Sequence, residues 1–119
     1  PESVTQIGQW AFFGCRELVK INLPKAVTEL KEKTFYSCEK LEKLILPEGL
    51  IRIGRECFKD CGFKKILLPE GIEIIEREAF ESCAKLSQIV LPKSLKSIGK
   101  KAFKGCTKLT TITVVAVEL

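Results

Sequence analysis

The chain has 119 residues, of which 45% are hydrophobic and 29% charged, and its formal net charge of +5 comes from 20 basic and 15 acidic residues. These values are ordinary for one soluble globular domain. Histidine is absent, which removes the commonest general base and the commonest metal ligand. No run approaches the roughly 18 apolar residues of a membrane-spanning helix, so membrane insertion is not expected.

One sequence motif, Phe-x-x-Cys-x-x-Leu-x-x-Ile, recurs along the chain. It is written as "WAFFGCRELVKI", "KTFYSCEKLEKL", "EAFESCAKLSQI" and "KAFKGCTKLTTI", with a shorter relative, "ECFKDCGFKKI". Counting from the proline of each Leu-Pro gives the units 1–23, 24–46, 47–68, 69–91 and 92–114, followed by a tail, 115–119. Four units have 23 residues and the third has 22, because one residue is missing beside Gly62.

We expect residues 1–119 to form one solenoid domain. Eight positions of each unit are apolar or small, and the clearest column is Phe12, Phe35, Phe58, Phe80 and Phe103. A 23-residue unit cannot bury its apolar face alone, whereas stacked units build a continuous core. The opening "PESVTQIGQW" has neither Met nor the basic and apolar segments of a signal peptide, so we expect a fragment of a longer chain.

Each unit predicts two elements. The final Ile-x-Leu alternates with period two and indicates a short strand, which stacked units would pair in parallel. The segment "GKKAFKGC" and its copies favour a tight helical or 3-10 turn on the opposite side. We therefore expect about five coils, with strands on one face and helical turns on the other.

The order Leu-x-x-Ile-x-Leu-Pro, apolar-x-x-Ile-Gly and Ala-Phe-x-x-Cys resembles the BspA-like class of leucine-rich repeats over essentially the whole chain. The resemblance implies a curved solenoid with a parallel sheet along one side. It also implies a secreted or cell-surface protein, of bacteria or parasitic protists, that binds other proteins or adheres to hosts. The sequence departs from the family's repeat pattern in two places. The last unit has "ITVV" where Leu-Pro is expected, and no strand precedes Pro1.

Five of the six cysteines share one column, which favours buried free thiols over a disulfide framework. Zinc binding is not expected, because Cys57-x-x-x-Cys61 supplies only two ligands and there is no Cys-x-x-Cys pair. The sequence predicts no metal and no cofactor. The column consists of Cys15, Cys38, Cys61, Cys83 and Cys106.

Catalysis and nucleic-acid binding are not expected either. No histidine is present to activate a thiol. The densest carboxylate cluster, Glu73, Glu76 and Glu78, falls on one coil without an evident pocket, and we interpret it as a solvated face. Lysines make the last unit basic, but no exposed aromatic residues interleave with them.

Two surfaces are candidates for binding a protein partner. On the outward side of the strands, the basic row Lys20, Lys43 and Lys65 runs beside an apolar stripe of Ile45, Leu67 and Val90. Extended faces of solenoids bind partners in this way. The alternative is that β-branched and aliphatic residues occupy the stripe because they fit a pleated sheet.

The second surface is aromatic. Trp10, Phe13 and Tyr36 occupy positions ten and thirteen of their units, where later units carry Lys or Glu, so we expect these positions to be exposed. Exposed aromatic residues anchor interfaces, but the interpretation we favour is that these three pack against a preceding unit or cap. The final "TITVVAVEL" predicts an apolar edge strand that either caps the core or pairs with another chain, which allows an end-to-end or edge-strand dimer.

Taken together, these observations predict a non-enzymatic module that binds a protein partner through the strand face, in adhesion or another interaction at the cell surface. The alternative is a purely structural spacer within a longer repeat array. The sequence does not specify the partner.

Overall fold

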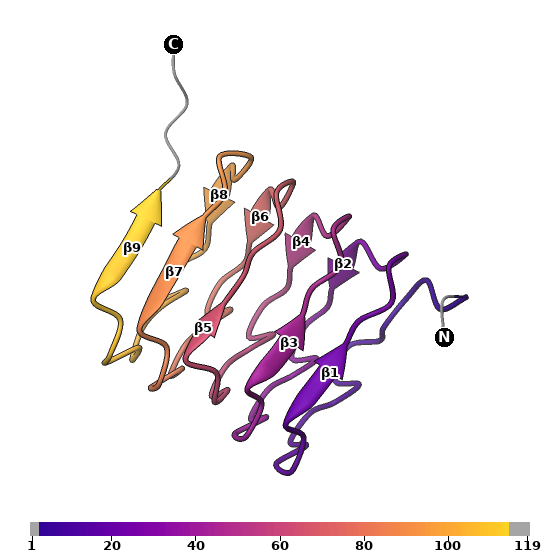
Figure 1. Cartoon of the computed structure of the whole chain (residues 1–119), viewed down its shortest axis with the longest axis horizontal. Coiled ribbons are helices and arrows are strands. Elements are labelled where there is room, and N and C mark those ends of the chain that lie inside the picture. The colour runs from indigo at the N-terminus through magenta and orange to yellow at the C-terminus, as the bar shows by residue number, and fades with distance from the viewer. Residues whose placement is uncertain (1–2, 115–119) are drawn as a thin grey trace.

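A computed structural model describes residues 3–114 as a solenoid with two rows of short parallel strands (Figure 1). None of these residues forms a helix with the length and hydrophobicity that a bilayer span requires. The front row contains β1 (Lys20–Asn22), β3 (Lys43–Ile45), β5 (Lys65–Ile66), β7 (Gln88–Leu91) and β9 (Thr111–Val114). The back row contains β2 (Glu29–Leu30), β4 (Arg52–Ile53), β6 (Ile74–Ile75) and β8 (Ser97–Ile98).

The predicted stacking of equivalent side chains is confirmed. The back strands pair in the order β2-β4-β6-β8, with Leu30 opposite Ile53 and Ile53 opposite Ile75. The phenylalanine rings stack from unit to unit with centroids 5.2 to 5.5 Å apart. The rings of the three central units are fully buried. A continuous core therefore runs through the solenoid between the two rows.

The expected number of coils is slightly too high. The front row has five strands, but the back row has four, because the described part of the first unit contributes no strand to it. The structure therefore makes about four complete turns.

The prediction of helical or 3-10 turns is wrong for the described residues, in which each unit instead has a run of hydrogen-bonded turns. The backbone has positive φ at position ten of every unit, for example +54° at Lys33 and +60° at Glu78. A right-handed helix excludes such angles. The turn amides bond to the next unit instead, as where the Phe35 N–H donates to the Cys57 carbonyl at 2.9 Å.

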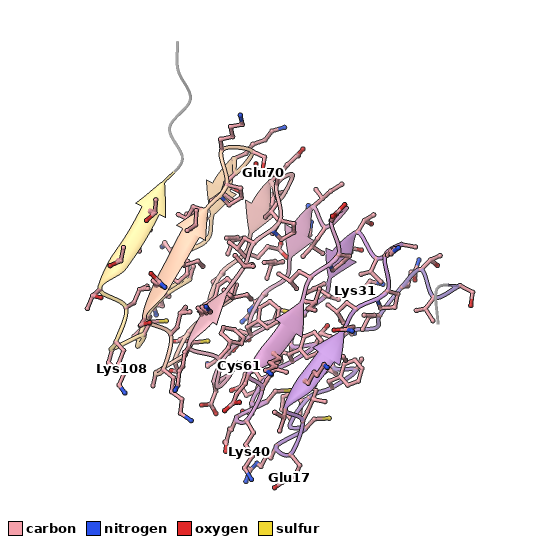
Figure 2. The ribbon with its side chains drawn as sticks, viewed as in Figure 1. Glu17, Lys31, Lys40, Cys61, Glu70 and Lys108 are labelled. Carbon is pink, nitrogen blue, oxygen red and sulfur yellow. The ribbon has the colours of Figure 1, made fainter. Side chains whose placement is uncertain are left out.

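The thiols have a definite role in this core. All six cysteines are free, and all but Cys15 are buried; Cys61 lies in the interior between the rows (Figure 2). The Sγ of Cys61 donates to the Phe35 carbonyl at 3.0 Å, and Cys83 does the same to Phe58 at 3.0 Å. Cys38 and Cys106 make the equivalent bonds in their units. The cysteine column therefore donates hydrogen bonds between units as well as filling space in the core.

The third unit, which is one residue shorter, packs differently from the others at Gly62 and Phe63. The Gly62 backbone lies so close to the preceding unit that a Cβ built there would come within 2.0 Å of the Glu39 carbonyl oxygen. Phe63 takes the place of the usual leucine, is 1% exposed, and packs edge-on against Phe58 and Phe80. The missing residue thus shortens the corner of the coil while the core stays filled.

Candidate protein-binding face

The outward surface of the front row, called the strand face below, carries the side chains that the sequence places there. Lys20 lies opposite Lys43 in the β1–β3 pair, and Asn22 lies opposite Ile45. Lys65, Leu67 and Val90 are exposed farther along the same face. Alternation along each short strand produces this arrangement, because the residue between two outward side chains faces the core.

The lysines of this face are not neutralised within the described part of the chain. None of Lys20, Lys43, Lys64 and Lys65 belongs to any of the eight ion pairs found among residues 3–114. Lys40 differs, because its ammonium lies 3.0 Å from the Glu17 carboxylate at the lower rim in Figure 2. Like charges on neighbouring strands repel. The Lys20–Lys43 pair is therefore an uncompensated cost to the fold.

Beside the lysines lies an exposed apolar row. Ile45 is 61% exposed, Leu67 83% and Val90 48%. Shallow hollows lie between these side chains, one of about 330 Å³ between Ile45 and Leu67 and one of about 200 Å³ between Leu67 and Val90. The strand face thus combines positive charge with apolar surface that water contacts freely.

The front sheet is interrupted, contrary to the expectation of continuous stacking. β1 pairs with β3, and β5 pairs with β7 and β9, but no backbone hydrogen bond among residues 3–114 joins β3 to β5. The interruption, called the break below, falls at the one unit of 22 residues. The shortened corner at Gly62 draws the incoming chain toward Glu39, and the strand that follows does not pair with β3.

The aromatic residues come together as one cluster. The Trp10 and Phe13 rings lie 4.7 Å apart, and the Phe13 and Tyr36 rings 4.9 Å apart. The Lys33 ammonium lies 4.5 Å from the Trp10 ring, and Lys59 lies 5.5 Å from the Tyr36 ring. Trp10 and Phe13 are each 43% exposed, whereas Tyr36 is half-buried. Sequence reasoning had not placed the two lysines in this cluster.

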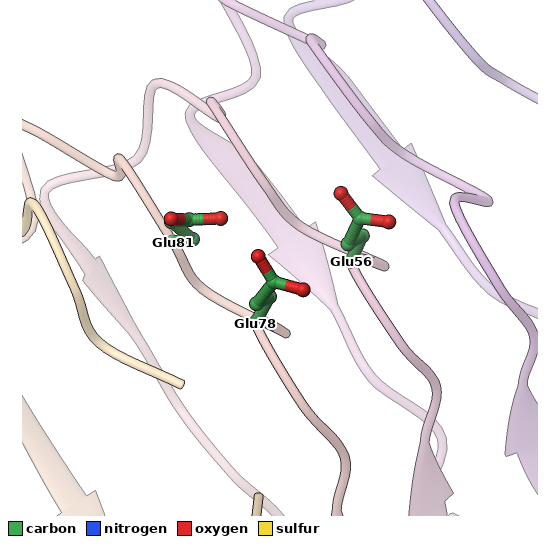
Figure 3. Close-up of side chains that lie close together, drawn as sticks. All are labelled: Glu56, Glu78 and Glu81. Atoms are coloured by element: carbon green, nitrogen blue, oxygen red, sulfur yellow. The ribbon is translucent and has the colours of Figure 1, made fainter. Parts of the chain in front are cut away.

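A carboxylate cluster lies farther along the same turns, formed by Glu56, Glu78 and Glu81, whose oxygens lie within 4.8 Å of one another (Figure 3). The Lys59 ammonium lies 3.2 Å from Glu56 and 3.0 Å from Glu81, and the Glu81 carboxylate raises its pKa. The Arg77 guanidinium lowers the pKa of Glu78 from 2.9 Å away. The basic side chains thus supply the positive charge that a metal ion would bring.

The carboxylates predicted as a solvated face are separately paired. Glu73 lies 3.4 Å from Lys96, and Glu76 lies 3.0 Å from Arg52. Of that set, only Glu78 belongs to the cluster of Figure 3. The arrangement is a network of ion pairs between adjacent coils.

Residues 1–110 match the family described as BspA type leucine rich repeat region, in six copies. The chain belongs to the BspA-type leucine-rich repeat family. No curated protein sequence matches this BspA-type chain.

Solved bacterial structures are similar to the BspA-type chain. A leucine-rich repeat protein of Bacteroides ovatus is 41% identical over 94% of the chain, with a TM-score of 0.90. The T. pallidum leucine rich repeat protein is 35% identical over 92%, with a TM-score of 0.90. A leucine rich cell surface protein of Faecalibacterium prausnitzii is 29% identical over 99%, with a TM-score of 0.94. The chain spans 29%, 51% and 31% of these proteins respectively.

One expectation about positions ten and thirteen is wrong for the middle of this BspA-type chain. Glu56 is 7% exposed and Glu81 is 9% exposed, although charged residues there predicted exposure. Adjacent coils lie on both sides of these residues, and Lys59 lies against both. The presence of both Lys and Glu at each of these two positions was the available signal, because equivalent positions of successive units are neighbours in a solenoid.

Proposed function

We propose that this BspA-type module binds another protein through the strand face, and that the bound segment carries carboxylates and apolar side chains. The observation that carries the proposal is the Lys20–Lys43 pair, stacked in register without a carboxylate partner beside the exposed Ile45. An acidic partner would relieve the repulsion between the lysines. Burial of the apolar row would add roughly 25 cal/mol for each Å² removed from water.

The proposed action is passive and non-catalytic. The paired front strands and the back sheet fix the backbone, so that binding orders few additional groups. Lys20, Lys43 and Lys65 supply attraction, while Ile45, Leu67 and Val90 supply buried area. We place this action at a cell surface, as in adhesion, because a similar structure belongs to a protein described as a cell surface protein.

A displayed library of random peptides tests the proposal. The chain is compared with a triple variant, Lys20→Glu, Lys43→Glu and Lys65→Glu, and with a control triple variant, Lys93→Glu, Lys100→Glu and Lys104→Glu. The control lysines are exposed and belong to none of the ion pairs among residues 3–114, so the two variants change net charge equally.

Enriched peptides should combine Asp or Glu with large apolar residues and should bind the wild-type chain and the control variant but not the strand-face variant. Equal binding to all three proteins would refute the assignment to this face. A library from which no peptide is enriched would instead favour the structural spacer.

A further inference from the structure

The break in the front sheet is the most specific feature of the strand face. We infer that the hollow between β3 and β5 is an anchor site that takes one large apolar side chain of the partner, flanked in the partner's sequence by carboxylates. This inference rests on the proposed function and narrows it to one position on the face.

The lining of the hollow indicates what it accepts. Its six residues are all apolar, and two of them, Ile45 and Leu67, project from opposite sides of the break. Leu67 is 83% exposed, more than any other large hydrophobic residue described among 3–114. The volume of about 330 Å³ lies at the small end of ligand pockets, which suits one side chain. The lining residues are Leu44, Ile45, Leu46, Leu67, Leu68 and Pro69.

Hollows also lie between paired strands of this face, one of about 420 Å³ lined in part by Asn22 and Ile45. The hollow at the break differs from them in the covalent length of the unit that follows it. That unit lacks one residue between Cys61 and β5, and the contact of Gly62 with Glu39 fixes the shortened corner. Phe63 is wedged between Phe58 and Phe80 directly after it. The back strands β2 and β4 remain paired across the same two units. A partner would therefore find the hollow already formed.

Charge decides the class of occupant. Lys43, Lys64 and Lys65 border the break, are exposed, and belong to none of the ion pairs described for residues 3–114. Glu42, also exposed, is the acidic residue beside them in sequence. The local excess of positive charge favours an acidic partner segment. It disfavours a second copy of this chain bound through the same face, because the two lysine rows would then meet.

The inference is tested by nuclear magnetic resonance on the ¹⁵N-labelled chain, with blocked synthetic peptides as probes. The peptide Asp-Trp-Asp should shift the amide signals of β3 and β5 saturably. Asp-Ala-Asp should bind at least about tenfold more weakly, a difference that corresponds to about 1.4 kcal/mol. Lys-Trp-Lys should not bind at the break, because its charges oppose those of the lysines.

Two variants separate the anchor site from the rest of the face. One inserts a single alanine between Gly62 and Phe63, which restores 23 residues and should let β5 pair with β3. The other is Leu67→Ser, which changes an exposed side chain and leaves the core intact. Both should weaken binding of Asp-Trp-Asp at least about tenfold. The matched change Ile51→Ser, at an exposed residue directly before the back strand β4, should have little effect.

The outcomes distinguish the two proposals. If Asp-Trp-Asp shifts the amides of the lysine row but binds Leu67→Ser as tightly as wild type, the anchor site is wrong while the proposed function stands. If no amide of the strand face responds to either acidic peptide at millimolar concentration, both fail.

Discussion

The thiol of Cys83 donates a hydrogen bond to the backbone carbonyl of Phe58, 3.0 Å away in the preceding unit. Cys61 bonds to Phe35 in the same way. The thiol therefore satisfies a buried carbonyl of the adjacent coil as well as filling space. A column of this kind couples neighbouring units through both packing and hydrogen bonding.

Replacement of Cys83 separates these two roles. Serine keeps a donor of similar shape, whereas alanine removes it and leaves the Phe58 carbonyl without that partner. We expect Cys83→Ser to retain about 1 kcal/mol more unfolding free energy than Cys83→Ala, measured by urea denaturation with a reductant. If the thiol were only a small hydrophobic group, serine would be no better than alanine.

The unfolding free energy should fall as the solution becomes alkaline. Burial raises the pKa of Cys57 and Cys61, so these thiols stay protonated in the folded state at a pH where the unfolded chain releases their protons. For Cys83, a hydrogen bond with Cys106 raises the pKa ahead of burial. A raised folded pKa gives stability that is complete below the unfolded pKa and is lost above it.

The decline should begin near pH 8.5, the ordinary thiol value, and approach about 1.4 kcal/mol per pH unit for each such thiol. Urea denaturation between pH 7 and pH 10 measures it. Cys83→Ser should reduce the slope, because it removes one titrating group. A constant unfolding free energy up to pH 10 would contradict the assignment.

Gly62→Ala should destabilise the chain by at least about 2 kcal/mol, because the new methyl group meets the Glu39 backbone, which cannot rotate away. Gly49→Ala is the matched control, since a Cβ there has no heavy atom within 4 Å. We expect the control to be neutral or slightly stabilising. Equal thermal denaturation midpoints for the two variants would show that the corner is looser than described.

Lys59→Met should destabilise the chain by roughly 2 kcal/mol, because it leaves the buried Glu81 carboxylate without its nearby cation. The double variant Lys59→Met, Glu81→Gln should lose less than the sum of the two single changes. The exposed pair of Lys40 and Glu17 provides the control, where Lys40→Met should change stability by less than about 0.5 kcal/mol. Additive losses in the double variant would contradict a direct interaction.

Lys43→Glu should stabilise the fold by about 0.2 to 1 kcal/mol in low salt, because it replaces a like-charge neighbour of Lys20 by an opposite charge. The gain should shrink in high salt. Lys108→Glu changes the net charge equally at an exposed position of the last unit and should have the smaller effect. A variant less stable than wild type would mean that the lysine row is compensated.

The sequence was sufficient to predict which positions of each unit form the buried columns of the core. Leu30, Ile53 and Ile75 recur at equivalent positions and are buried as predicted, although the second row of strands to which they belong was not predicted. The strand-face residues Lys43 and Ile45 were placed by the same argument and are exposed as expected. Repetition makes such predictions reliable, because five equivalent residues can be compared at each position of the unit.

The remaining features depend on interactions that no single unit reveals. The sequence shows that one residue is missing beside Gly62. It does not show how the shorter coil adjusts, because the unpaired strand that results depends on packing against Glu39. The burial of Glu56 depends on cations of its own and neighbouring coils, including Lys33 and Lys59. The turns escaped prediction because positive φ at charged residues leaves little trace in composition.

The ladder along the turns also has a direction. The Phe12, Phe35, Phe58 and Phe80 amides each donate to the coil that follows, so along this ladder each turn presents donors toward the next coil and acceptors toward the preceding one. A unit inserted in the same orientation would find matching partners on both sides, whereas an inverted one would set donor against donor. Such an array can lengthen by tandem duplication of whole repeats.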